Sequence, residues 1–148
     1  VIKQPSVQIG IPASIPADYV TDLQTRIGLY RRLGTIMKSS EIDEIEKEFI
    51  DRFGPIPIHV QNLLYMIKLK QRARLVGIRS IFRNHKIIIL QMENTIGDTK
   101  LVLKRLMPEG AIVGNTQIRL NLDEISSSWE TSLDDILNVL TDLQNVCT

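Results

Sequence analysis

The sequence contains very little cysteine and histidine. Among its 148 residues there is one cysteine, Cys147, and there are two histidines, His59 and His85, which lie far apart in the sequence. A single cysteine cannot form a disulfide within the chain, and neither histidine has a second ligand at the short spacing typical of a zinc site. We therefore expect no disulfide and no bound metal, and we expect a reducing compartment, the cytoplasm.

The motifs of several functional classes are also missing. There is no phosphate-binding loop of the form G-x-x-x-x-G-K-[ST], no dinucleotide-binding G-x-G-x-x-G and no nucleophile motif G-x-S-x-G. No run of about 18 apolar residues is present, so no transmembrane helix is expected. We predict that this chain is not an enzyme, that it takes no cofactor and that it has no membrane partner.

What remains is the composition of an ordinary globular domain. Hydrophobic residues make up 43% and charged residues 24%, and the formal net charge is +1, so the bulk charge does not favour a polyanion as partner. The sequence starts without methionine and without the pattern of a signal peptide. We interpret it as a piece of a longer protein and expect this piece to be monomeric.

The first 20 residues differ from the rest in their content of proline. Pro5, Pro12 and Pro16 interrupt a weakly alternating segment, which is typical of a linker or of an edge strand. We interpret residues 1–20 as a linker that tethers the chain to an upstream domain. Residues 21–148 are then predicted to form one domain.

Three helices are predicted in the first half of this domain. The first begins near Thr21, where Thr21 and Gln24 have capping-box spacing, and extends to about Met37. The second begins near Ser40 with Asp43 and ends at Gly54, and Phe49 and Phe53 are predicted to anchor it in the core. The third follows Pro57 and extends to about residue 76; its apolar residues cover most of its circumference, which is typical of a central helix.

The second half alternates between strands and helices. Residues 80–83 and 86–92 are predicted to form a hairpin, residues 99–107 a short helix, and residues 111–113 and 117–122 a second hairpin. A last helix follows Ser127, which has capping-box spacing with Glu130. The predicted fold class is α+β: three N-terminal helices, then two antiparallel hairpins around a short helix, then a closing C-terminal helix.

Four acidic residues of the second predicted helix form a stripe. The acidic stripe consists of Glu41, Glu44, Glu48 and Asp51, whose spacing of three, four and three places them on one helix face. One interpretation is an ordinary solvated face, with Glu48 paired to Arg52 one turn later and Asp43 paired likewise to Lys47. The other is a docking face for a basic partner.

A basic block occupies residues 68–86, within a stretch that contains no acid. Its candidate contacts to a nucleic acid are Lys68, Arg72, Arg79 and Arg83. Only one aromatic residue, Phe82, lies inside the block, whereas proteins that bind single strands present several stacking rings. The acidic residues after Arg119 offer a second interpretation, in which the two halves of the chain neutralise one another. Both interpretations remain open at this point.

Several phrases of the sequence together resemble the C-terminal domain of bacterial transcription-repair coupling factors. They are Ile15-Pro16-Ala17-Asp18-Tyr19-Val20, Thr25-Arg26-Ile27 with Leu29-Tyr30-Arg31-Arg32, Asp51-Arg52-Phe53-Gly54-Pro55-Ile56-Pro57 and Gly77-Ile78-Arg79. The resemblance covers about residues 7–80. The D-R-F-G-x-x-P phrase is its most specific element, because it joins the glycine that ends one helix to the proline that begins the next.

The resemblance implies a non-catalytic regulatory domain of an ATP-dependent DNA translocase. In that family the domain docks on the N-terminal excision-repair-like module of the same protein and covers the surface that recruits nucleotide excision repair. The partners implied for the full-length protein are RNA polymerase, double-stranded DNA and the damage-recognition subunit. The family's docking carboxylates match Glu48 and Asp51 here, with Arg52 beside them and Glu44 one turn earlier. The alternative is a nucleic-acid-binding accessory module that uses the basic block.

Overall fold

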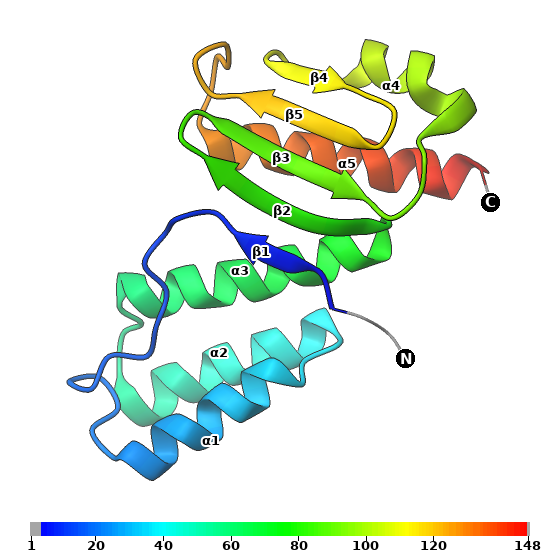
Figure 1. The fold of residues 1–148 in the computed structure, drawn as a ribbon. Helices are drawn as coiled ribbons and strands as arrows, with labels where there is room; N and C mark the ends of the chain where they lie inside the picture. Colours follow the sequence, from blue (N-terminus) through cyan, green and yellow to red (C-terminus); the bar gives the residue numbers. More distant parts are fainter. Residues whose placement is uncertain (1–3, 148) are drawn as a thin grey trace. The chain divides into compact units, whose positions relative to one another are not determined.

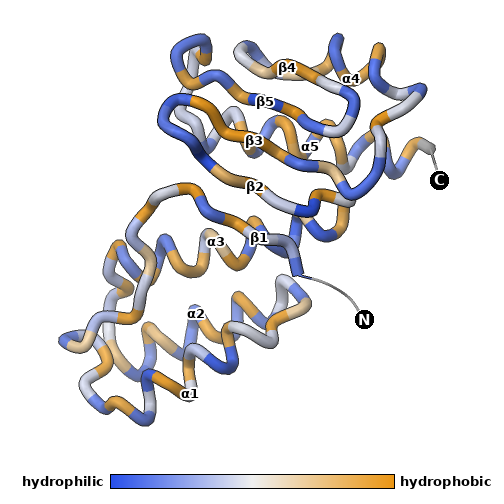
Figure 2. The backbone as a smooth tube through the Cα atoms, viewed as in Figure 1, coloured by the Kyte–Doolittle hydropathy of each residue, from blue (hydrophilic) through white to orange (hydrophobic). Residues whose placement is uncertain are grey.

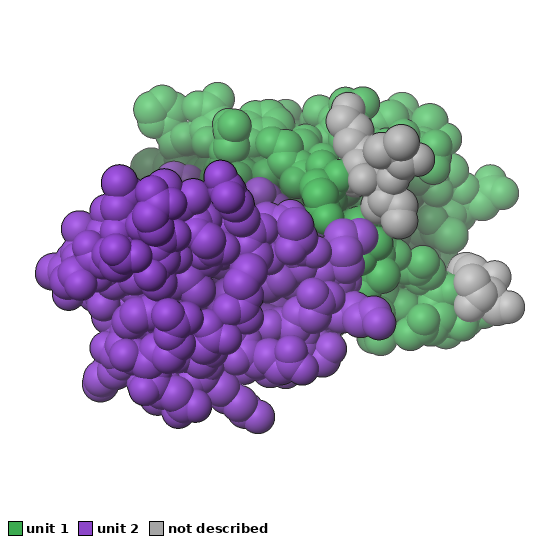
Figure 3. Space-filling view, turned by 90° about the horizontal axis from the view of Figure 1, so that it is seen from below, with its two compact units in different colours: residues 1–9, 72–148 green, residues 10–71 purple. Residues whose placement is uncertain are grey.

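The computed structural model describes residues 4–147 as two compact units. Unit 2 contains residues 10–71, and unit 1 contains residues up to 9 together with residues from 72 onward; Figure 3 colours the two units. Unit 2 is helical, whereas unit 1 combines one sheet with helices (Figure 1). The predicted α+β class is confirmed. The division into two units at residues 9 and 72 was not predicted from the sequence.

Three helices surround the core of unit 2. They are α1 (Leu23–Gly34), α2 (Ser39–Phe53) and α3 (Ile58–Leu75), the last of which continues into unit 1. One buried cluster joins the loop before α1 to all three helices: Ile15, Val20, Leu29, Leu33, Ile36, Ile42, Ile45, Phe49, Val60 and Leu64. The buried side of α2 is therefore the predicted one, with Phe49 fully buried and Phe53 partly buried at its edge.

The helix starts differ from the predicted capping boxes. The N-cap of α1 is Asp22, whose carboxylate accepts hydrogen bonds from the Thr25 backbone N–H and hydroxyl, so the pairing of Thr21 with Gln24 was wrong. In α2 the Glu41 carboxylate accepts from the backbone N–H of Lys38, which replaces the predicted pair Ser40 and Asp43. A carboxylate carries a full negative charge, so it accepts a stronger hydrogen bond from a backbone N–H than a neutral hydroxyl does. This favours Asp22 over Thr21 as the N-cap of α1.

Unit 1 contains a five-stranded sheet with the strand order β1-β2-β3-β5-β4. Its strands are β1 (Ser6–Gln8), β2 (Ile78–Asn84), β3 (Ile87–Met92), β4 (Ala111–Val113) and β5 (Gln117–Asn121). Both predicted hairpins, β2–β3 and β4–β5, are confirmed, and antiparallel pairing of β3 with β5 joins them into one sheet. The segment of residues 1–20 that was interpreted as a linker contains the edge strand β1, which pairs in parallel with β2.

Two helices of unit 1 follow the predicted pattern. The short helix α4 (Lys100–Leu106), preceded by a 3₁₀ turn at Gly97–Thr99, connects the two hairpins. The last helix is α5 (Trp129–Cys147). The Ser128 hydroxyl accepts the N-cap hydrogen bond from the Thr131 backbone N–H, so the N-cap is Ser128 and not the predicted Ser127.

The core of unit 1 lies between α5 and the sheet. In Figure 1, α5 passes behind β3 and β5, and Figure 2 colours much of β3 as hydrophobic. Alternate residues of the sheet and one side of α5 are fully or almost fully buried: Ile81, Ile88, Leu90, Ile118 and Leu120 on the strands, and Leu133, Ile136 and Leu137 on the helix. No helix among residues 4–147 is long and apolar enough to cross a membrane.

Candidate functional site

The acidic stripe lies on α2, away from the buried face of that helix. Ile42, Ile45 and Phe49 are buried, whereas Glu44 and Asp51 are exposed and have no ion pair among the described residues. The predicted helical spacing therefore gives a continuous face on the surface of unit 2. Its four carboxylates nevertheless differ in their hydrogen-bond and ion-pair partners, and this difference decides what the face can bind.

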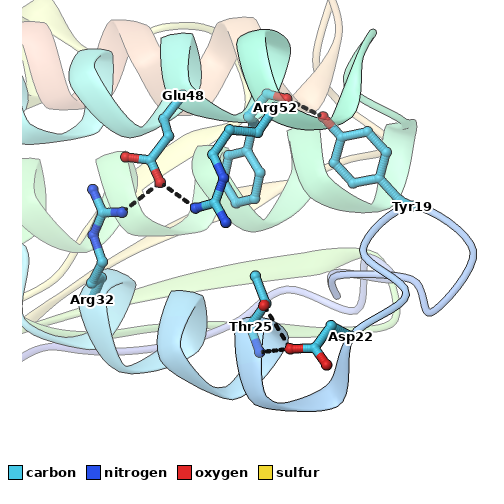
Figure 4. A network of polar contacts seen from close by, with 7 residues as sticks. Tyr19, Asp22, Thr25, Arg32, Glu48 and Arg52 are labelled. Carbon is cyan, nitrogen blue, oxygen red and sulfur yellow. Dashed lines mark hydrogen bonds and ion pairs between the residues drawn. The ribbon is translucent and has the colours of Figure 1, made fainter.

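Glu48 is held between two arginines. One of its oxygens, Oε2, accepts a hydrogen bond from Arg32 of α1 at 2.7 Å and another from Arg52 of α2 at 2.9 Å (Figure 4). These two hydrogen bonds hold the pKa of the Glu48 carboxyl below its usual range, and the one from Arg32 has the larger effect. The predicted pairing of Glu48 with Arg52 is confirmed, but the three groups together carry a net positive charge. The pairing of Asp43 with Lys47 is not formed.

Glu41 caps the start of the same helix. Its Oε1 accepts hydrogen bonds from the backbone N–H groups of Lys38 and Met37, at 3.2 and 3.4 Å. A hollow of about 120 Å³ next to it is lined by Arg32, Thr35, Ile36, Glu41, Glu44 and Ile45. The carboxylates that remain unpaired on the stripe are therefore Glu44, beside this hollow, and Asp51, at the other end of the helix.

The end of α2 that carries Asp51 and Arg52 is fixed by Tyr19. The Tyr19 hydroxyl lies 3.1 Å from the Phe49 carbonyl oxygen and 2.9 Å from the Gly54 carbonyl oxygen, and its single proton can be donated to either. Its ring packs against Phe49 and Phe53, with centroids 6.1 and 5.7 Å apart, and partial burial raises the pKa of the hydroxyl. Gly54 follows with φ of +92°, a backbone conformation that favours glycine. The D-R-F-G phrase thus forms a rigid end to α2.

Arg52 belongs to the same rigid end. Its guanidinium carbon lies 4.9 Å from the centre of the Phe53 ring, so the side chain stacks on the ring while it donates to Glu48. About half of the side chain is exposed, 48% for Arg52 and 51% for Arg32. Both arginines are therefore oriented by their neighbours and still accessible to a partner.

The four candidate nucleic-acid contacts are divided between the two units, and three of them have partners within the chain. Lys68 belongs to unit 2 and lies 3.9 Å from Glu46, whereas Arg72 belongs to unit 1 and pairs with Asp134 and Asn138 of α5. Arg79 is exposed on β2, and Arg83 donates to the backbone carbonyl of His85. The pairs of Arg72 with Asp134 and of Lys86 with Asp123 support the second interpretation, in which the two halves neutralise one another.

Two residues of this site were not identified as site residues from the sequence. Arg32 approaches Glu48 from another helix, and Tyr19 approaches α2 from the loop before α1. Both lie inside phrases that carry the family resemblance, which was the one signal that pointed to them. No group of three or more histidine, cysteine or acidic residues in the described part of the chain could hold a metal ion.

Comparisons with known proteins agree on one family. The model of the TRCF domain family matches residues 9–100. The transcription-repair-coupling factor of Escherichia coli K12 is 36% identical over 84 residues, which cover 57% of this chain and 7% of that protein. That of Rickettsia conorii is 31% identical over 142 residues, which cover 82% of this chain and 13% of that protein. The chain therefore spans a small fraction of the length of these relatives.

The fold agrees with the same assignment. A crystal structure of the C-terminal domain of transcription-repair coupling factor superposes with a TM-score of 0.77 over 97% of this chain and 96% of that chain, at 18% sequence identity. At this identity the match shows the fold alone, but it extends beyond residue 100, where the family model ends. The chain belongs to the TRCF domain family of transcription-repair coupling factors.

Proposed function

We propose that this chain is a non-catalytic regulatory domain that docks on the N-terminal excision-repair-like module of its own full-length protein. By analogy with the family, the full-length protein is an ATP-dependent DNA translocase in the cytoplasm that acts on RNA polymerase stalled on double-stranded DNA. Docking would cover the surface that recruits the damage-recognition subunit of nucleotide excision repair. Residues 1–20 would then connect the domain to the upstream motor.

The observation that carries this proposal is the surface of α2. It presents Glu48, Asp51 and Arg52 near the end of the helix that Tyr19 and Gly54 hold rigid, and Glu44 one turn before Glu48. A preorganised charged face loses little conformational entropy when a partner binds, and complementary charges direct both the orientation and the choice of the partner. Glu48 and Asp51 are also the positions that match the docking carboxylates of the family.

The alternative, a nucleic-acid-binding module, has less support. Of its four candidate residues, Lys68 and Arg72 already have carboxylate partners inside the chain, and Arg83 donates to a backbone carbonyl. Affinity for nucleic acid depends on the release of counterions by cations that contact phosphates, and paired cations contribute less to it.

A binding experiment separates the two functions. The 148-residue chain is titrated into the N-terminal module of the same protein and, separately, into duplex DNA, each over a series of salt concentrations. We expect saturable binding to the module and weak binding to DNA at 150 mM salt, a typical physiological ionic strength of about 0.15 M. Tight DNA binding with a steep salt dependence, together with no binding to the module, would replace the docking function with the alternative.

A further inference from the structure

The face of α2 that carries the acidic stripe bears charges of both signs. In the Arg32–Glu48–Arg52 cluster two guanidinium groups share one carboxylate oxygen, and the exposed Glu44 and Asp51 lie about one helical turn before and after Glu48. The face therefore combines a net positive cluster at Glu48 with two exposed carboxylates nearby on the same helix. The sequence stripe alone would indicate a uniformly acidic face.

The central cluster has hydrogen-bonding capacity to spare. A guanidinium group carries five N–H donors, and Arg32 and Arg52 each use one of them on Glu48. Among the described residues their other donors have no acceptor, and about half of each side chain is exposed, 51% and 48%. The geometry is suited to a bidentate anion, because planar guanidinium groups match the two oxygens of a carboxylate.

The neighbours of the cluster decide which anion fits. Glu44 and Asp51 lie about one turn before and after Glu48, and they would repel a nucleic-acid backbone, which carries a negative charge at every phosphate. They would attract cations placed on either side of a single anion. A folded protein surface can present such a pattern, whereas a phosphate chain cannot.

We propose that the Arg32–Glu48–Arg52 cluster is a binding site for a carboxylate of the docking partner, and that this carboxylate is flanked on the partner by basic groups that face Glu44 and Asp51. This inference rests on the proposed docking function and specifies the chemistry of the partner. Glu48 acts here as a positioning residue that orients the two arginines, and Asp51 makes the direct contact with a partner cation.

The sign of one mutational effect tests this assignment. If the arginines bind a partner carboxylate, Arg32→Ala weakens binding of the chain to the N-terminal module by about tenfold, the order of one charge-assisted contact. If Arg32 only neutralises Glu48, and Glu48 itself binds a partner cation, the same change strengthens binding. The matched control is Arg31→Ala, because Arg31 is the neighbouring arginine on α1, is exposed and has no partner among the described residues.

The comparison variant is Asp51→Asn, and the affinities of all variants are measured by calorimetry after circular dichroism has verified their fold. Weaker binding of both Arg32→Ala and Asp51→Asn, with Arg31→Ala unchanged, supports the assignment. Weaker binding of Asp51→Asn with stronger binding of Arg32→Ala overturns the carboxylate site but keeps the docking function. Unchanged binding of both overturns the docking face itself. If the wild-type chain binds duplex DNA and the Arg32→Ala variant loses that binding, the anion is a phosphate, and the proposed carboxylate of a protein partner is overturned.

Discussion

In the full-length protein, replacement of Glu48 and Asp51 together by alanine is expected to raise the affinity for the damage-recognition subunit by about tenfold or more. In the proposed docking, the double change removes the Asp51 carboxylate that would meet a partner cation, and it leaves Arg32 and Arg52 without the group that orients them. Loss of one partner from a charged contact at an interface typically costs about 2–5 kcal/mol. A docked state that is favoured by only a few kcal/mol would then open and expose the recruiting surface.

The control for this experiment must remove two negative charges from α2 without touching the docking face. Asp43→Ala with Glu46→Ala meets this condition. Asp43 is exposed and forms no ion pair with another described residue, and Glu46 lies 3.9 Å from Lys68, a long and exposed pair that contributes little to stability. Glu41 is unsuitable, because it accepts hydrogen bonds at the start of the helix. Equal release by the control pair would show an effect of general charge, and no release by Glu48→Ala with Asp51→Ala in a folded domain would contradict the specific docking face.

The largest expected effect on stability is that of Phe49→Ala. The Phe49 side chain is completely buried, and its ring packs against those of Tyr19 and Phe53 at centroid distances of 6.1 and 6.2 Å. Truncation leaves a cavity in the core of unit 2, so the free energy of unfolding should fall by about 3–5 kcal/mol. Urea unfolding followed by circular dichroism measures this change.

Ile50→Ala is the matched control for the core, because Ile50 is the next residue of α2 and is 51% exposed. We expect it to lower the free energy of unfolding by less than about 1 kcal/mol, as is usual for an exposed position. A loss of that small size for Phe49→Ala as well would mean that α2 presents a different face to the core, and the acidic stripe would then not lie on the surface.

Much of the fold could be predicted from the sequence, because its signals are local. The period of Ile42, Ile45 and Phe49 fixes the buried side of α2, and Gly54 with Pro57 fixes the turn between α2 and α3. Prediction failed where neighbouring residues are equally suited to the same position, such as the N-cap of a helix. Thr21 and Asp22 both suit a helix start, as do Ser127 and Ser128, and only the three-dimensional structure shows which side chain meets a free N–H.

The candidate site shows the same limit more clearly. Helical spacing placed the acidic residues on one face and paired Glu48 with Arg52, since both belong to α2. It could not show Arg32, which reaches Glu48 from α1 and makes the centre of the face positive. The pairing of β3 with β5 and of β1 with β2 was missed for the same reason, because contacts between distant segments leave no periodic signal in the sequence.

A competition experiment tests the proposed masking function most directly. The affinity of the damage-recognition subunit for the N-terminal module is measured while the 148-residue chain is added in increasing amounts. The docking account predicts that the apparent affinity of the subunit falls as the chain saturates the module, and that the chain with Glu48→Ala and Asp51→Ala has little effect at the same concentration. An unchanged affinity of the subunit on a module that is saturated with the wild-type chain would contradict it.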